Sequence, residues 1–258
     1  MTAFLHHNLP DSLILEIGFL KLHWYGLLIA IAILVCLFIL SKLARFRQIA
    51  LDQIFDLSFY LIIFGFIGAR LWHILFYNLS YFINQPLAVF KVWQGGLAIH
   101  GAILAGLITV YLYAKKQKLS FWLLADLLAV VLPLGQAIGR WGNYFNQELY
   151  GKACSFSWCI PISGEAGYFH PVFLYESILS LILFISLLLV LRLGQLKVGM
   201  ITVIYLGGYS LIRFFMEFLR LDIAGSWFWG LNWQQILSLA VMMLAVQLVL
   251  RLGLSKNR

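Results

Sequence analysis

Seven long apolar stretches constrain this chain more than any other feature of its sequence. They cover residues 23–41, 57–77, 97–114, 121–138, 172–191, 198–218 and 233–252. Each is close in length to the roughly 20 residues that an α-helix needs to cross a hydrocarbon core about 30 Å thick. Segments that alternate apolar and polar positions, as a membrane β-barrel requires, do not occur in the sequence. The sequence therefore predicts an all-α integral membrane protein with seven transmembrane helices.

The composition supports this fold class, because 63% of the 258 residues are hydrophobic and only 11% are charged. Soluble domains are about half apolar and about a quarter charged. We expect residues 1–258 to form a single membrane domain. The start of the chain lacks the basic region and the small-residue cleavage site of a signal peptide, so we expect the first helix to remain in the mature protein.

The net charge of +8 indicates orientation rather than nucleic-acid binding, because the basic residues lie in short loops beside the apolar stretches. Eleven of them fall on one side of the predicted membrane: Lys42, Arg45, Arg47, Lys115, Lys116, Lys118, Arg192, Lys197, Arg251, Lys256 and Arg258. Five fall on the other side: Lys21, Lys91, Arg140, Lys152 and Arg220. Since the more basic side faces the cytoplasm, we predict an N-terminus outside the membrane and a cytoplasmic C-terminus. We expect no nucleic-acid partner.

The three cysteines indicate little chemistry of their own. Cys36 lies inside an apolar stretch and is typical of a small buried hydrophobic residue. Cys154 and Cys159 share an outer loop, where a disulfide and two free thiols are both open. Neither has a His or Cys partner at ligand spacing in the sequence, and no nucleotide-binding loop is present, so we expect no metal and no cofactor.

Polar residues of chemical interest gather toward the outer side of the predicted membrane. They are Tyr25, Arg70, His73, His100, Arg140, Arg213, Glu217 and Arg220, and we expect one cluster. An Arg inside an apolar span costs about 2.5 to 3.5 kcal/mol on insertion scales, so Arg70 and Arg213 each need a partner or a water-filled cavity. Arg213, Glu217 and Arg220 share one helical face, which fits either an intramembrane ion pair or an arginine kept for an anion.

The densest polar segment is residues 139–151, at the start of a predicted outer loop over 139–171 that we take as the active-site region. It contains Arg140, Asn143, Asn146, Glu148 and Gly151. Guanidinium matches phosphate oxygens, amides donate and accept hydrogen bonds, and glycine lets backbone approach a ligand. These residues favour a phosphate-bearing ligand, and the alternative is a tight turn whose aromatic residues lie at the membrane interface.

Among the histidines, His100 is the candidate general base. Glycines stand close to it on both sides, at Gly96 and Gly101, and histidine is the side chain most often used as a general base. A structural task is the alternative for His100, and it is the favoured interpretation for His73 and His170.

The run from Arg140 to Gly151 resembles the signature of the prolipoprotein diacylglyceryl transferase family. Five further ordered motifs support the resemblance: His23-Trp24-Tyr25-Gly26; Gly68-Ala69-Arg70; Gly96 to Gly101 with His100; His170-Pro171 to Tyr175-Glu176; and Arg213 to Phe218. The family has seven spans with an outer N-terminus, which agrees with the topology predicted from apolar length and charge.

The resemblance implies a reaction and its partners. The diacylglyceryl group of phosphatidylglycerol moves to the thiol of the lipobox cysteine of a prolipoprotein, which gives a thioether and releases glycerol phosphate. The expected partners are phosphatidylglycerol, prolipoprotein signal peptides and membrane lipid, and the expected location is the bacterial inner membrane. The nucleophile is the cysteine of the substrate, which agrees with the lack of a conspicuous catalytic Cys in this chain.

The resemblance also implies roles for individual residues. Catalytic roles fall to His100, Arg140, Arg213, Glu148 and Tyr25, and substrate binding to Arg140, Asn143, Asn146, Gly151, Arg70 and Glu217. The sequence departs from the family pattern at Gln147, where Gly is usual, and at Arg220-Leu221-Asp222, where Arg-Glu-Pro-Asp is usual. The second departure leaves the roles of Arg220 and Asp222 open.

Two other function classes fit the sequence less well. An anion transporter or channel would need polar residues along its whole path, but the cytoplasmic halves of the spans contain little except Asp56 and Asp126. A purely structural membrane protein would leave Arg70 and Arg213 unexplained. We therefore expect a transferase that draws its lipid from the bilayer between helices.

Overall fold

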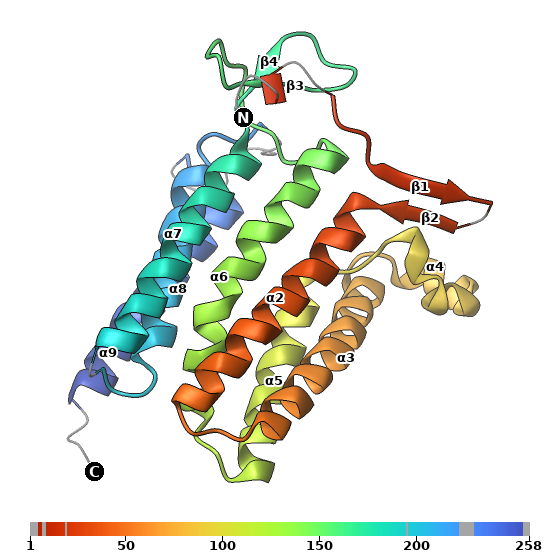
Figure 1. Cartoon of the computed structure of the whole chain (residues 1–258). Coiled ribbons are helices and arrows are strands. Elements are labelled where there is room, and N and C mark those ends of the chain that lie inside the picture. Colours follow the sequence, from red (N-terminus) through yellow and green to blue (C-terminus); the bar gives the residue numbers. More distant parts are fainter. Residues whose placement is uncertain (1–4, 7–8, 19, 195, 222–229, 255–258) are drawn as a thin grey trace. The chain divides into compact units, whose positions relative to one another are not determined.

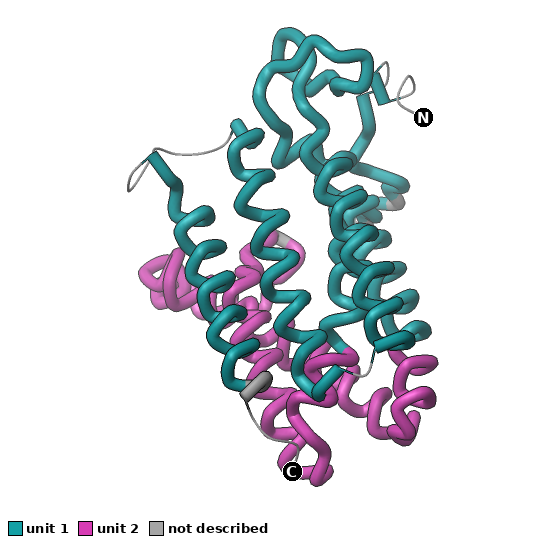
Figure 2. Tube along the Cα trace, turned by 90° about the vertical axis from the view of Figure 1, so that its left-hand side faces the viewer, with its two compact units in different colours: residues 1–39, 128–258 teal, residues 40–127 magenta. Residues whose placement is uncertain are grey.

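The structure is a computed structural model that describes residues 5–6, 9–18, 20–194, 196–221 and 230–254. The chain forms two compact units: unit 1 comprises residues 1–39 and 128–258, and unit 2 comprises residues 40–127 (Figure 2). The boundaries between the units fall inside two helices, α2 (Trp24–Phe46) and α6 (Phe121–Asn146).

Unit 1 contains helices from both ends of the chain. After the shared helices α2 and α6 come α7 (Val172–Leu193), α8 (Met200–Met216) and α9 (Trp233–Leu254). Helix α8 packs against both α7 and α9. Two short antiparallel hairpins lie outside the helices: β1 (Leu13–Ile17) pairs with β2 (Leu20–His23), and β3 (Ile160–Pro161) pairs with β4 (Tyr168–Phe169) (Figure 1). The fold is helical, as predicted, with these hairpins as additions that the apolar pattern did not reveal.

Unit 2 is a pair of long helices with a folded connection between them. Its elements are α3 (Leu51–Phe76), α4 (Leu79–Asn84), the 3₁₀ turns η1 (Pro86–Phe90) and η2 (Val92–Gln94), and α5 (Ile99–Gln117). Helices α3 and α5 cross at Gly68 and Gly101, where a Cβ atom on either glycine would overlap the backbone of the other helix. Small residues at this crossing permit close helix packing.

Five helices among the described residues are long and apolar enough to cross a membrane: α2, α3, α6, α7 and α9. Helix α8 is apolar but has only 17 residues, and α5, with 19 residues, is not among the five. These helices fit an integral membrane protein. The seven-span topology and the orientation of the termini stay predictions.

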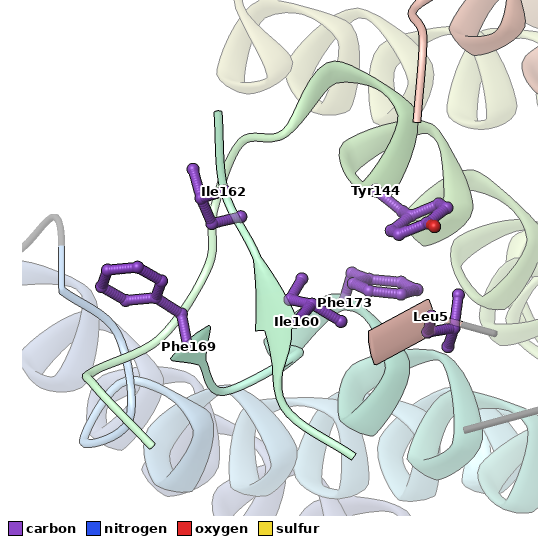
Figure 3. Packing of buried hydrophobic residues seen from close by; sticks show 6 residues of the cluster. All are labelled: Leu5, Tyr144, Ile160, Ile162, Phe169 and Phe173. Carbon is purple, nitrogen blue, oxygen red and sulfur yellow. The ribbon is translucent and has the colours of Figure 1, made fainter. Parts of the chain in front are cut away.

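A hydrophobic cluster holds the loop between α6 and α7 against the ends of those helices. Its buried members are Leu5, Tyr144, Ile160, Ile162, Phe169 and Phe173 (Figure 3). The rings of Tyr144, on α6, and Phe173, on α7, lie 5.0 Å apart. The same loop contains a disulfide between Cys154 and Cys159, so of the two alternatives left open by the sequence the structure has the bonded one. The cluster and the disulfide together fix the loop beside the polar residues described next.

Candidate active site

The polar segment begins as helix rather than as loop. We predicted an outer loop over 139–171, but α6 continues to Asn146, so Arg140 and Asn143 are helical residues. Residues three apart lie on one helical face, and the Arg140 Nη1 atom donates to Asn143 Oδ1 at 3.3 Å. The last turns of α6 therefore present the arginine and the amide together, from a rigid element.

Glu176, in the first turns of α7, joins two arginines from different helices. Its Oε1 atom lies 2.5 Å from Nη1 of Arg213, on α8, and its Oε2 atom lies 2.5 Å from Nη2 of Arg140. Charge-assisted contacts of this kind are about twice as strong as neutral hydrogen bonds. One buried carboxylate thus sets the distance and orientation of Arg140 and Arg213.

A second carboxylate extends this network along α8. Glu217, which caps the helix, accepts a hydrogen bond from Arg213 Nη2 at 2.8 Å, and its Oε1 atom lies 3.9 Å from Nε of Arg220. Of the two alternatives that the sequence left open for this helical face, the ion pair between Arg213 and Glu217 is therefore present. Arg220 also belongs to the network, whereas Asp222 lies outside the described residues.

A third carboxylate, Glu148, is connected to Arg140 through an amide. Asn143 Nδ2 donates to Glu148 Oε1 at 2.8 Å, and Asn146 Nδ2 lies 3.5 Å from the same oxygen. The turn after α6 places Glu148 between two residues with left-handed backbone, Gln147 at φ 52° and Leu149 at φ 58°. This turn brings the Glu148 carboxylate back over the end of the helix that carries Arg140.

The arginines of this network are more open than the carboxylates. The side chains of Arg140 and Arg213 are 19% and 17% exposed, compared with 3% for Glu176 and 2% for Glu217. A guanidinium has five N–H donors, and the contacts of Arg140 with Glu176 and Asn143 use only part of them. The accessible side of the network therefore offers N–H donors suited to an anion.

Two glycines of the polar segment are needed for close packing. A Cβ atom on Gly142 would overlap the ring of Tyr25, which places this tyrosine directly against α6 two residues from Arg140. A Cβ atom on Gly151 would lie 2.7 Å from His170 Cβ and 2.8 Å from the Leu219 carbonyl oxygen. Gly151 also forms an isolated β-bridge with Arg220. The structure thus assigns Gly151 a packing task beside the network.

Arg70 and His100, two further candidate residues, belong to unit 2. The Arg70 guanidinium is buried and donates to four backbone carbonyls, those of Ala88, Val89, Gly95 and Gly96, at 2.7 to 3.0 Å. These bonds hold the connection between α3 and α5. His100 is exposed in the first turn of α5, and its ring lies 6.0 Å from that of Trp72. The expected single cluster that includes Arg70 and His100 stays a prediction.

Two features of unit 1 escaped the sequence analysis. Glu176 was part of a motif but was not named as a site residue, although a carboxylate within an apolar stretch is as informative as an arginine there. His170 was not expected beside the cysteines, yet its ring nitrogen lies within 4.8 Å of both sulfur atoms of the Cys154–Cys159 pair. Those sulfurs are bonded to each other, and the His170 ring lies 3.2 Å from the Tyr175 hydroxyl.

Comparison with known proteins identifies the family. The family model for prolipoprotein diacylglyceryl transferase matches residues 12–251. A protein of Thermosynechococcus vestitus named phosphatidylglycerol–prolipoprotein diacylglyceryl transferase is 42% identical over 217 residues, 81% of each chain. Relatives with the same name are 42% identical in Trichormus variabilis, over 85% of this chain and 82% of theirs, and 39% identical in a Synechocystis species, over 83% and 80%. The chain belongs to the prolipoprotein diacylglyceryl transferase family.

Proposed function

We propose that this protein transfers the diacylglyceryl group of phosphatidylglycerol to the cysteine thiol of a prolipoprotein. The thiol sulfur forms a bond to the terminal glycerol carbon of the diacylglyceryl group, and the bond from that carbon to the phosphate oxygen breaks. The products are a thioether-linked lipoprotein precursor and glycerol phosphate. The family membership supports this reaction, and the observation that carries it is the pair Arg140 and Arg213 on the two oxygens of buried Glu176.

The arginine pair supplies what the departing phosphate needs. The leaving group gains negative charge as the carbon–oxygen bond breaks, and donors already in place stabilise that charge without reorganising. Arg140 and Arg213 both contact the buried carboxylate of Glu176, and the side chains of both arginines stay partly exposed. Arg140 would contact the phosphate of phosphatidylglycerol, with Asn143, Asn146 and Gly151 beside it, while Glu148 and Glu217 orient the arginines.

The nucleophile belongs to the substrate, so the protein must promote loss of its proton. A free thiol has a pKa of about 8.5, so only a few per cent is thiolate at neutral pH. We assign the general base to His100 and place Tyr25 at the site as a further catalytic group. Replacement of His100 by Gln should then slow transfer most at low pH, where the substrate thiol is least ionised, and unchanged transfer across pH would remove His100 from the mechanism.

The proposed topology places this chemistry where exported precursors present their cysteines. The seven apolar stretches predict seven spans, and the distribution of basic residues predicts an outer N-terminus and a cytoplasmic C-terminus. The membrane would be the bacterial inner membrane. The signal peptide of the precursor would dock as a further helix, and phosphatidylglycerol would enter from the bilayer between helices.

The test is transfer of radiolabelled diacylglycerol from phosphatidylglycerol to a lipobox peptide by the purified protein. Native protein should label the peptide cysteine, and Arg140→Ala should abolish the label. Arg192→Ala is the matched control, because Arg192 is an exposed arginine at the end of α7 and should leave transfer unchanged. No transfer by folded native protein would contradict the proposal and favour anion transport by the same arginines.

A further inference from the structure

Unit 2 contains a cavity of its own at the end of α3. It measures about 300 Å³ and is lined by residues from α3, α4 and the η turns, among them Arg70, His73, Asn78, Tyr81 and Lys91. The edge of the His73 ring and Arg70 Nη1 both flank Gly96, where a Cβ atom would lie 2.6 to 2.8 Å from them. Gly95 and Gly96 have left-handed backbone, at φ 88° and 82°, which lets the chain pass this close. The cavity therefore gathers donors from separate segments of the unit.

The cavity is positively charged. Arg70 is only 7% exposed and contacts carbonyl oxygens and the face of Phe82, whose ring centre lies 5.1 Å from the guanidinium carbon. The sequence has no Asp or Glu between Asp56 and Asp126, so no carboxylate from this stretch balances Arg70 or Lys91. A buried cation is costly unless an opposite charge accompanies it. An anion in the cavity would supply that charge.

The donors suit a phosphate. Lys91 offers an ammonium group, His73 a ring N–H, and Asn78 an amide N–H, while Arg70 keeps an N–H beyond those given to the four carbonyls. Ammonium and guanidinium groups are the usual protein partners of phosphate oxygens. No lining residue of the cavity is acidic.

The surroundings of the cavity favour a phosphate that belongs to a lipid. Large apolar side chains on α4, η1 and η2 are exposed: Ile83 at 67%, Leu87 at 78%, Phe90 at 72% and Trp93 at 76%. Aromatic and aliphatic side chains in such an arrangement lie at membrane interfaces, with acyl chains beside them. A phospholipid would place its phosphate in the cavity and its acyl chains along these residues.

We propose that this cavity binds the phosphate of an anionic phospholipid through Lys91, His73 and Arg70. All lining residues of this cavity lie in unit 2, and none of its donors contacts Arg140, Glu176 or Arg213 among the described residues. Arg70 also holds the loop that forms the wall of the cavity, so His73 and Lys91 are the residues to change.

The test uses the full-length protein in lipid nanodiscs with a phosphatidylglycerol analogue that carries a photoreactive headgroup. Crosslinks are mapped by mass spectrometry in the native chain and in a His73→Gln and Lys91→Gln double variant. The loss of two charge-assisted contacts should reduce crosslinks to residues 77–96 by at least about tenfold. Lys116→Gln, an exposed lysine near the C-terminal end of α5, is the control and should crosslink like the native chain.

Competition identifies the source of the phosphate. Unlabelled phosphatidylglycerol should suppress the crosslinks, whereas phosphatidylcholine and inorganic phosphate at the same concentration should not. Suppression by inorganic phosphate equal to that by the lipid would overturn the lipid assignment. Unchanged crosslinking in the double variant would overturn the site itself, and Lys91→Gln alone decides the question if the double variant does not fold. Diacylglyceryl transfer by the same proteins is measured in parallel. Normal transfer with unchanged crosslinking in the double variant would overturn this cavity as a binding site and leave the proposed function standing.

Discussion

Glu176 connects more of the site than any other single residue, because its two carboxylate oxygens contact arginines from two helices. Removal of one partner from a buried ion pair leaves an uncompensated charge and costs about 3 to 5 kcal/mol. The carboxylate therefore has two consequences, one for stability and one for the position of the guanidinium groups. Both can be measured.

Glu176→Gln keeps the shape of this side chain and removes its charge. We expect diacylglyceryl transfer to fall by about 100-fold or more, because the arginines lose the carboxylate that orients them toward the phosphate. The thermal midpoint in detergent should fall as well. Glu165→Gln changes an exposed acid in the loop between α6 and α7 and should change neither quantity. A Glu176→Gln variant with native transfer would show that the arginines are positioned without it.

Gln147 stands where the family usually has glycine, and its backbone has the left-handed φ of 52° that favours glycine. Its side chain compensates: Nε2 donates to the Pro10 carbonyl at 3.0 Å, and Oε1 accepts from the Ser163 N–H at 2.6 Å. Gln147→Ala loses both bonds and keeps the strain, while Gln147→Gly loses the bonds but relieves it. The alanine variant should therefore be less stable than the glycine variant by about 1 kcal/mol in equilibrium unfolding. The reverse order would show that the left-handed conformation is not retained.

At the residue scale the sequence indicated which charged side chains need a partner but not what each one contacts. Insertion cost correctly singled out Arg70 and Arg213, because a guanidinium in an apolar span needs a partner. The partners differ: Arg213 contacts two carboxylates, while Arg70 contacts backbone carbonyls of the connection between α3 and α5. Loop carbonyls leave no signature in the sequence, so the loop-holding contacts of Arg70 could not be predicted.

At the scale of elements the apolar pattern located the helices well and their polar ends poorly. The predicted stretch 121–138 ends with the last apolar residues of the run. Helix α6 continues to Asn146, and its last turns contain Arg140 and Asn143. Those side chains are satisfied by Glu176 of α7 and by Glu148 in the turn that follows α6. A helix can continue past its apolar residues when the polar side chains at its end bond to neighbouring elements. A helix boundary placed by hydropathy alone misses those last turns.

The crossing of α3 and α5 provides a matched pair of glycines. A Cβ atom at Gly101 would overlap the Gly68 backbone, whereas one at Gly65, on α3, would meet nothing within 4 Å. Gly101→Ala should force the helices apart and lower the thermal midpoint. Gly65→Ala should leave it unchanged or raise it, since alanine is better than glycine in a helix by about 1 kcal/mol. Equal effects of the two changes would contradict close packing at this crossing.

At the scale of the whole molecule, the number of spans depends on whether α5 and α8 cross the membrane. If α5 crosses the membrane, Lys91 before it and Lys116 after it lie on opposite sides. Lys91→Cys should then react with an impermeant thiol reagent added outside intact cells, and Lys116→Cys only after the cytoplasmic side is opened. The native chain, whose free cysteine is Cys36 among the described residues, measures background labelling. Labelling of both positions from outside would rule out a crossing by α5.

We propose that α6, α7 and α8 bring Arg140 and Arg213 to one phosphate. Residues that act on the same group through a shared partner are not additive, so removal of either should cost nearly as much as removal of both. The most direct measurement is the single-turnover rate of transfer from phosphatidylglycerol for native protein, Arg140→Ala, Arg213→Ala and the double variant. We predict a double variant only slightly slower than the slower single variant. Losses that multiply, as for two independent residues, would show that Arg140 and Arg213 do not act on one phosphate.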